Sequence, residues 1–323
     1  MARFNMSLGP KKCPVLRTIK KLTTVLFLVI LVVLAISTDA SRATLSALRD
    51  LNLDSFILLT VLFLIARILQ GITLINSLAA NGRHVTLLES FDLSVLKMFY
   101  NQIVPSSGVF AQFLTLKKRL NIPAQDFIAA QYFQITIQVT LLGLIMAGMG
   151  VSLPIGNNLL RGAMVVGGFA LALSPFVTLL GANVALQRLP SKIAKNIVDQ
   201  VGKTSDAIGA NVSIAVWLLL VRALFVLSRV IRLWVLALLV DSSVDLHVLS
   251  GATFVAEVAI LVPITPGGVG LRESVIAAAG GSIGMVDVFL AAALIDRGFA
   301  LAFNTLFGLL VVTKNHIGSA GAS

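Results

Sequence analysis

Six long apolar runs recur along the whole chain and constrain its fold more than any other feature. They cover Leu22–Ser37, Phe56–Ala80, Phe127–Gly150, Ala163–Gly181, Val212–Val240 and Val286–Thr313. At about 1.5 Å per residue, most of these runs can cross about 30 Å of hydrocarbon as helices. They lack the polar face that a soluble helix needs, and only 12% of the 323 residues are charged. The sequence therefore predicts an all-α polytopic membrane protein with about six transmembrane helices.

Two further apolar segments, about 93–120 and 246–281, are interrupted by proline and glycine. Each half is too short to cross a bilayer, so each segment predicts a re-entrant pair of half-helices. Broken backbone at membrane depth is tolerated only where protein or a wet cavity surrounds it. The tips are expected at Pro105 and Gly108 in the first segment, and at four residues in the second. These four are Pro266, Gly267, Gly268 and Gly270.

An internal repeat relates the two broken segments. Pro105 precedes Asp126 by 21 residues, and Pro266 precedes Asp287 by the same interval. Three spans separate the segments, so the two hairpins would enter from opposite sides, as in the inverted repeats of many secondary transporters. The alternative is a coincidence of spacing, because the aligned residues share little identity.

The expected organisation is a single transmembrane domain over residues 22–314, with a basic cytoplasmic segment at 1–21 and a short cytoplasmic tail at 315–323. The first apolar run is interpreted as a retained span, with a signal peptide as the lesser alternative. Lysine and arginine gather in short loops that this topology puts on the cytoplasmic side, including Arg83 and Lys97. The clustering explains the net charge of +11, so nucleic-acid binding is not expected.

Charged residues within membrane segments are the candidates for a functional site, because each costs about 2.5–3.5 kcal/mol or more at the bilayer centre. The candidates for substrate binding are Arg222, Arg229, Glu257, Arg272, Glu273, Asp296 and Arg297, with Arg67 and Arg232 also charged. Arg222 and Arg229 share one helix face, and no acid lies in the same span. Phosphate is a natural counter-ion for such arginines, because guanidinium binds it bidentately. The alternative is that the charges only pair and hold the helices together.

Other chemistries find no support in the sequence. The three histidines are scattered, no HExxH motif occurs, and Cys13 is the single cysteine. The GGVG stretch is not followed by the GK[ST] of a P-loop. We therefore expect no metal, no cofactor and no enzymatic activity.

The stretch PITPGGVGLRES and the mid-span DRGFAL resemble the integral-membrane flippase domain of bacterial lysyl-phosphatidylglycerol synthases and its stand-alone relatives. The resemblance implies a Pro-Gly-Gly-x-Gly-x-x-Glu tip at 266–273 and a mid-membrane arginine at Arg297. It also matches the family's first tip to Asn101 and Pro105. Gln112 stands where Glu273 aligns, and Thr136 stands where Arg297 aligns, so the first repeat keeps hydrogen bonding but drops charge. Gln112 and Asn101 join the substrate-binding candidates.

The resemblance and the buried arginines together predict a lipid flippase or transporter in the bacterial inner membrane. It would move a phosphate-containing lipid or a lipid-linked sugar, with membrane lipids as its partners. The alternatives are a membrane-embedded transferase and a non-transporting accessory protein that works with envelope lipid or polysaccharide enzymes. The aminoacyl-transferase domain is not seen in this sequence, so synthesis of lysyl-phosphatidylglycerol is not implied.

Overall fold

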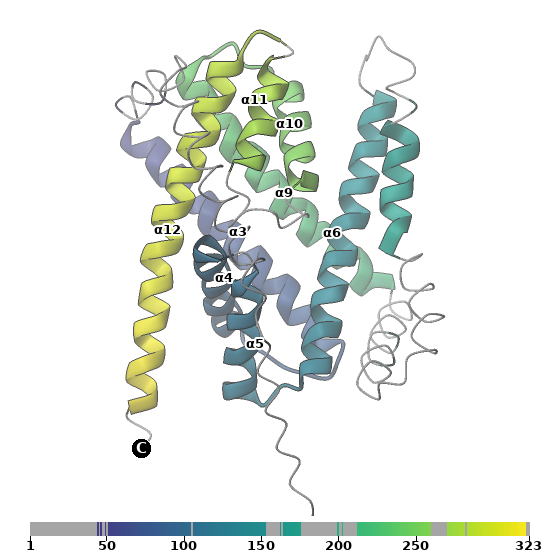
Figure 1. Ribbon diagram of the computed structural model, residues 1–323, viewed down its shortest axis with the longest axis vertical. Helices are drawn as coiled ribbons and strands as arrows, with labels where there is room; N and C mark the ends of the chain where they lie inside the picture. The colour runs from purple at the N-terminus through teal and green to yellow at the C-terminus, as the bar shows by residue number, and fades with distance from the viewer. Residues whose placement is uncertain are drawn as a thin grey trace, which may run out of the picture.

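Long helices run along most of the described chain (Figure 1). The computed structural model describes residues 44, 46, 49, 51–104, 106–152, 162, 164–175, 199, 202, 212–259, 270–281 and 283–320. The main helices are α3 (Leu53–Ala79), α4 (Leu87–Ile103), α5 (Ser107–Leu120), α6 (Ala124–Ser152), α9 (Val212–Val240), α10 (Leu246–Ala259), α11 (Leu271–Gly281) and α12 (Val286–Ala320). No strand occurs among these described residues, which confirms the predicted all-α class.

Three of the described helices are long and apolar enough to cross a membrane: α3, α6 and α9. They coincide with three of the predicted spans. Helix α12 covers the predicted span Val286–Thr313 and carries charged side chains at its middle. Met164–Pro175 is a shorter apolar helix inside the predicted span Ala163–Gly181. The first predicted span, Leu22–Ser37, lies outside the described residues.

Both interrupted segments form pairs of helices that pack against each other, α4 with α5 and α10 with α11. The second pair has the predicted outer bounds, residues 246 and 281. The first pair begins six residues earlier than predicted, at Leu87 rather than Leu93. Its start is fixed by a capping box, in which Thr86 Oγ1 accepts from the Glu89 backbone N–H while the Glu89 carboxylate accepts from the Thr86 N–H.

The α4–α5 pair lies in the lower part of Figure 1, and the α10–α11 pair lies in the upper part. Each pair has its own apolar core. The lower core includes Leu78, Leu116 and Phe127, and the upper core includes Leu249 and Phe289. The two pairs are therefore separately packed units at opposite ends of the molecule.

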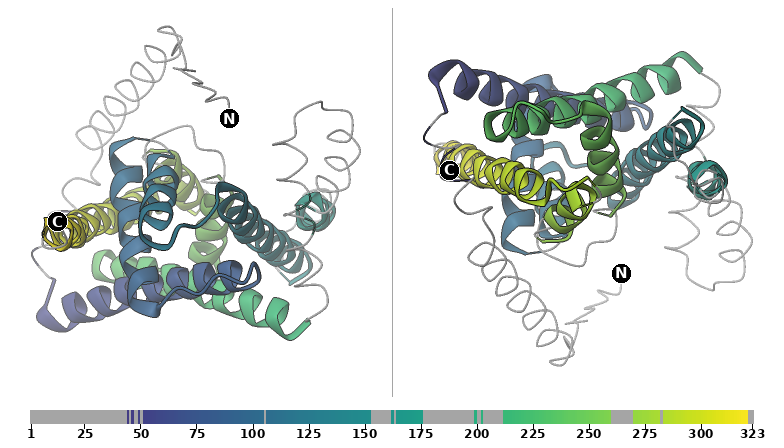
Figure 2. Two further views of the ribbon diagram at one scale, coloured as in Figure 1. Left: turned by 90° about the horizontal axis from the view of Figure 1, so that it is seen from below. Right: turned by 90° about the horizontal axis from the view of Figure 1, so that it is seen from above.

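Several helix contacts correspond when α3–α6 is exchanged with α9–α12. Helices α3 and α9 pack on each other along one edge, as both views of Figure 2 show. Helix α3 packs on α6 as α9 packs on α12, and α4 packs on α12 as α10 packs on α6. Close approach in the α12–α4 pair depends on Gly308, where an added Cβ would lie 2.5 Å from the Phe99 ring.

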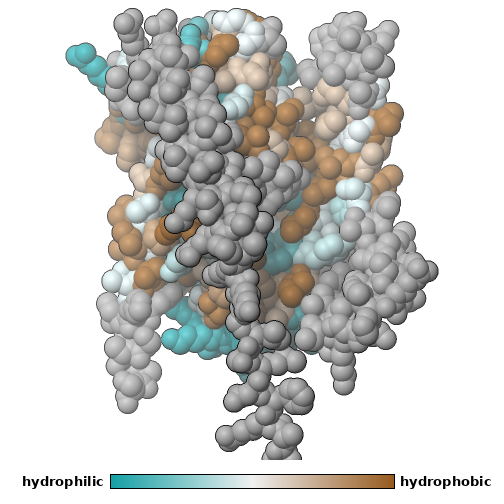
Figure 3. All heavy atoms as spheres, viewed as in Figure 1, coloured by the Kyte–Doolittle hydropathy of each residue, from teal (hydrophilic) through white to brown (hydrophobic). Residues whose placement is uncertain are grey.

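The outward faces of the long helices carry large apolar side chains. Figure 3 shows hydrophobic residues over much of the described surface, with hydrophilic residues at the lower end. On α9, Val216, Leu220 and Leu224 are about half exposed, and Leu306 and Leu310 on α12 are more so. An apolar exterior around a polar interior is the arrangement that a lipid environment favours.

Candidate functional site

A cavity of about 270 Å³ lies between the two helix pairs. Its wall contains residues from both breaks, Asn101 and Ser106 of the first and Glu257 and Arg272 of the second. Seven cationic side chains of the described residues line the cavity: Arg67, Lys97, Arg222, Arg229, Arg232, Arg272 and Arg297. Glu257 is the one carboxylate in the described wall. The described wall of the cavity is therefore strongly cationic.

Asp296 on α12 holds two of these arginines. Its carboxylate accepts from Arg232 on α9 with both oxygens, the second at 3.2 Å, and it also accepts from Arg272 on α11. All three side chains are buried, with Asp296 at 0% exposure. The Arg232 guanidinium also lies 3.8 Å from the centre of the Phe63 ring on α3. One carboxylate thus links α9, α11 and α12, and a cation–π contact adds α3.

Arg229 donates to Glu257 of α10 across 2.6 Å, so this arginine also has an acidic partner from another helix. Within the α9 span alone no acid is available, and the sequence therefore predicted phosphate as the counter-ion of its arginines. The structure corrects this for two of them, because Glu257 and Asp296 come from α10 and α12. Only tertiary packing could supply these partners.

Three other cations of the cavity hydrogen-bond to glutamine. Arg67 donates to Gln70 at 2.8 Å, Lys97 donates to Gln131 at 3.1 Å, and Arg222 donates to Gln138. Among the described residues, these three cations form no ion pair. Gln131, Gln134 and Gln138 occupy successive turns of α6, and all three line the cavity. This side of the cavity therefore combines unneutralised positive charge with neutral amides.

The first helix break is fixed by Gly108 and Asn101. A Cβ added at Gly108 would lie 1.8 Å from the Lys97 carbonyl oxygen, so only glycine allows α5 to begin this close to α4. Asn101 Oδ1 accepts from the Gly108 backbone N–H at 2.8 Å and thereby caps α5 from the neighbouring helix. Ser106, before α5, adopts a left-handed conformation with φ of 62°. Pro105 lies outside the described residues.

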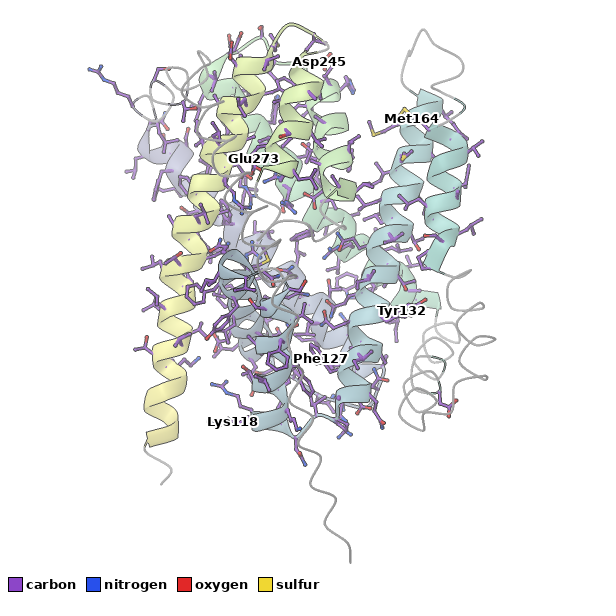
Figure 4. All side chains as sticks on the ribbon, viewed as in Figure 1. Lys118, Phe127, Tyr132, Met164, Asp245 and Glu273 are labelled. Atoms are coloured by element: carbon purple, nitrogen blue, oxygen red, sulfur yellow. The ribbon has the colours of Figure 1, made fainter. Side chains whose placement is uncertain are left out.

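At the second break, α11 begins at Leu271, after Gly270 with φ of 85°. Glu273 Oε2 accepts from the Gly270 backbone N–H at 2.7 Å, so this carboxylate caps its own helix. Figure 4 labels Glu273 inside the molecule near α12, whereas Lys118 and Asp245 lie at its lower and upper ends. The predicted tip residues Pro266, Gly267 and Gly268 lie outside the described residues.

Comparison with models of known protein families places the chain in one of them. A family model described as "Lysylphosphatidylglycerol synthase TM region" matches residues 21–308. The chain belongs to this family. No curated protein and no solved structure matches the chain. Membership of the lysylphosphatidylglycerol synthase TM region family, together with the long apolar helices, makes this a membrane protein of a lipid-related family.

The cavity wall contains six of the nine substrate-binding residues that were predicted for this member of the lysylphosphatidylglycerol synthase TM region family. They are Asn101, Arg222, Arg229, Glu257, Arg272 and Arg297. The other three, Gln112, Glu273 and Asp296, are buried outside the described wall. Gln112 accepts from Gln131, which lines the cavity, at 3.2 Å. Glu273 acts electrostatically on Arg297, but the carboxylate that bonds to Arg232 of α9 and Arg272 of α11 is Asp296.

Three cavity residues were missed as binding candidates. Arg67 and Arg232 were recognised only as charges within the membrane, and Lys97 was placed with the cytoplasmic loops. The structure corrects the position of Lys97, which lines the cavity from the middle of α4. One signal was available, because Lys97 precedes Asn101 by four residues and so lies on the same helix face.

The chemistry of the cavity favours binding of an anion. Among the described residues, no group of three histidine, cysteine or acidic side chains could hold a metal ion. The arginines offer planar donors that match phosphate oxygens, and the amides of α6 offer neutral hydrogen bonds.

Proposed function

We propose that this protein is a flippase or transporter that moves a phosphate-containing lipid, or a lipid-linked sugar, across the bilayer. The observation that carries the proposal is the convergence of seven cationic side chains on one cavity inside an apolar helical protein. Buried charges are costly in a membrane and are retained where they have a function. The headgroup phosphate would occupy the cavity, while the acyl or prenyl chains stay in the surrounding lipid.

The dimensions of the cavity support this division of the substrate. A volume of about 270 Å³ is slightly below the ~300–1,000 Å³ of typical small-molecule sites. It suits a headgroup rather than an entire lipid. Family membership independently associates the chain with lipids.

We further propose that α4–α5 and α10–α11 are re-entrant hairpins of an inverted repeat. Helices of 17, 14, 14 and 11 residues are each shorter than the ~20 residues that a spanning helix needs. The location of the pairs at opposite ends of the molecule and the corresponding helix contacts support this topology. It would allow the substrate to reach one cavity from either side, as alternating access requires.

The orientation that accompanies this proposal puts both termini in the cytoplasm of a bacterial cell, with the protein in the inner membrane. Lys117, Lys118 and Arg119 at the end of α5, and Lys314 near the end of α12, would face the cytoplasm. Single cysteines near Ser107 and near Gly268, in a chain with Cys13→Ser, test the topology. Labelling of both positions from only one side of the membrane in every condition would contradict it.

Transport is tested with the purified full chain in liposomes that contain lipids with fluorescent headgroups. Loss of outer-leaflet fluorescence to a membrane-impermeant quencher, beyond the amount in protein-free liposomes, measures translocation. Arg222→Gln should slow translocation about tenfold or more, because it removes a charged donor from the headgroup site. Lys118→Gln removes an equal charge from an exposed position and should leave the rate unchanged.

The two rival functions have distinct outcomes in the same experiment. A membrane-embedded transferase would convert the labelled lipid chemically, which mass spectrometry of the extracted lipids detects. An accessory protein would neither convert nor translocate it. Translocation by wild type that Arg222→Gln does not slow would contradict the assignment of the cavity as the transport site.

A further inference from the structure

We propose that Arg67, Lys97 and Arg222 form a subsite for a phosphate group that carries two or more negative charges, a terminal phosphomonoester or a pyrophosphate. This proposal rests on the proposed function and deepens it, since it names the class of headgroup and the side of the cavity that binds it. It distinguishes such lipids from ordinary phosphodiester lipids, whose phosphate carries one negative charge.

The first argument is the balance of charge. The cavity and its surroundings contain seven cations, and the carboxylates around them are Glu257, Glu273 and Asp296 among the described residues. Four positive charges therefore have no acidic counterpart in this part of the chain. A phosphodiester carries one negative charge and would leave most of this positive charge unbalanced. A phosphomonoester carries about −1.5 to −2, and a pyrophosphate carries a similar or larger negative charge.

The second argument locates the excess. Asp296 bonds to Arg232 and Arg272, and Glu257 bonds to Arg229. In contrast, Arg67, Lys97 and Arg222 bond to glutamine amides, which orient a cation without neutralising it. Arg67 and Arg222 are nearly fully buried, at 5% and 7% exposure, and Lys97 and Arg222 repel each other electrostatically. The surplus positive charge is thus concentrated between α3, α4, α6 and α9.

The third argument comes from buried donors that the described protein leaves unpaired. The Nε atoms of Arg67 and Arg222 and the Nε2 atom of Gln134 have no hydrogen-bond partner among the described residues. Arg272 Nε and Nη2 are unpaired as well, but the charge of Arg272 is paired with Asp296. An unpaired buried donor is costly, and a phosphate oxygen accepts from such groups. Arg67, Gln134 and Arg222 line the same cavity, so their free N–H groups suit one multivalent acceptor.

The cavity wall also contains buried acceptors without a partner among the described residues. Glu257 Oε1 is a buried acceptor without a partner in the described chain, and both polar side-chain atoms of Asn304 are likewise unpaired. A carboxylate oxygen repels phosphate but accepts from hydroxyl or ammonium groups. The phosphate therefore belongs with Arg67, Lys97 and Arg222, the cations without an ion pair, and hydroxyl or ammonium groups of the headgroup suit Glu257 Oε1.

Lipid retention tests the preference. The 323-residue chain is reconstituted in nanodiscs of phosphatidylcholine that contain equal amounts of phosphatidic acid, a phosphomonoester, and phosphatidylglycerol, a phosphodiester. Native mass spectrometry then measures which lipid stays bound. We expect phosphatidic acid to be retained about tenfold more than phosphatidylglycerol. Equal retention, or a preference for phosphatidylglycerol, would overturn the proposal.

Substitutions of Arg67 and Arg222 test whether the preference for phosphatidic acid depends on the subsite. Arg67→Gln and Arg222→Gln should each bring the ratio of the two lipids close to one, while the surface control Lys118→Gln keeps the wild-type ratio. If either glutamine variant fails to fold, Arg67→Lys and Arg222→Lys keep the charge, lose the planar fork, and should give an intermediate ratio. An unchanged ratio in folded variants would overturn the assignment.

Inorganic pyrophosphate separates a lipid headgroup from a free anion. Displacement of phosphatidic acid by pyrophosphate in the wild type, and weaker displacement in Arg222→Gln, would support one shared site. Binding of pyrophosphate without any lipid preference would overturn the lipid assignment. Retention is independent of translocation, so a protein that prefers phosphatidic acid but does not move lipids would contradict the proposed function alone.

Discussion

Asp296 on α12 contacts Arg232 on α9 with both of its carboxylate oxygens, and one of these oxygens also accepts from Arg272 on α11. The two arginines are held at 3–4% side-chain exposure by a single fully buried acid. Removal of that acid would leave two buried cations without their ion-pair partner. The stability of the helix assembly around the cavity therefore depends on this residue.

Asp296→Asn should destabilise the protein by about 3–5 kcal/mol, the usual effect of breaking a buried ion pair on one side. Thermal unfolding in detergent measures the loss. Adding Arg272→Gln to Asp296→Asn should recover part of it, because one uncompensated charge is removed. Asp54→Asn, at an exposed position on α3, is the control. If Asp296→Asn alone proved as stable as Asp54→Asn, the ion pairs of Asp296 would not contribute to the stability of the fold.

Gly108→Ala should prevent normal packing of α5 against α4. The added methyl would lie 1.8 Å from the Lys97 carbonyl oxygen, and backbone cannot move aside cheaply. We expect a lower yield of folded protein and a lower melting temperature. Gly298→Ala is the matched control, since a Cβ there meets no atom within 4 Å. Equal stability of the two variants would mean that the first helix break is looser than described.

Asn101 caps α5 and also lines the cavity, and Asn101→Asp separates these two roles. The variant keeps the acceptor for the Gly108 N–H, so α5 should stay capped and the melting temperature should change little. It also puts a negative charge into the cavity wall, which should weaken phosphate-lipid binding severalfold. Asn101→Ala should do the reverse, with a loss of about 1 kcal/mol in stability and a small effect on binding. Melting temperature and lipid retention, measured on the same preparations, compare Asn101→Asp with Asn101→Ala.

The capping box at the start of α4 predicts a dependence on pH. The Thr86 backbone N–H, and then its hydroxyl, donate to the Glu89 carboxylate and hold the pKa of Glu89 below its ordinary value of 4.5. Because the folded-state pKa is lowered, this stabilisation is complete above about pH 4.5 and is lost as pH falls through the lower folded value. Hydrogen exchange of the amides of residues 87–90, corrected for intrinsic rates, should show fraying of α4 in acid.

Glu89→Gln is the control for that measurement, because its amide oxygen still accepts but does not titrate in this range. Its exchange should be insensitive to acid. Acid fraying that persists in Glu89→Gln would assign the effect to another group.

Local sequence signals predicted the pieces of this protein well. Long apolar runs gave α3, α6 and α9, and proline and glycine breaks gave the two helix pairs, because hydrocarbon length and backbone stereochemistry act within a segment. The Leu87 start of α4 was missed although Thr86 and Glu89 form a recognisable capping signature. The tip glycine Gly108 was found because only glycine tolerates such a close approach of two backbones.

The site shows where the sequence alone was insufficient. It identified Arg222, Arg229 and Arg297 as unusual, since a charge in an apolar helix is costly wherever the helix lies. Whether a given arginine is neutralised is decided by acids 28 to 64 residues away in sequence, as Arg229–Glu257 and Arg232–Asp296 show. The position of Lys97 in the cavity, and the glutamine partners of Arg67, Lys97 and Arg222, likewise depend on how α3, α4, α6 and α9 pack. Helix formation is a local property of the chain, whereas compensation of charge is a property of distance in three dimensions.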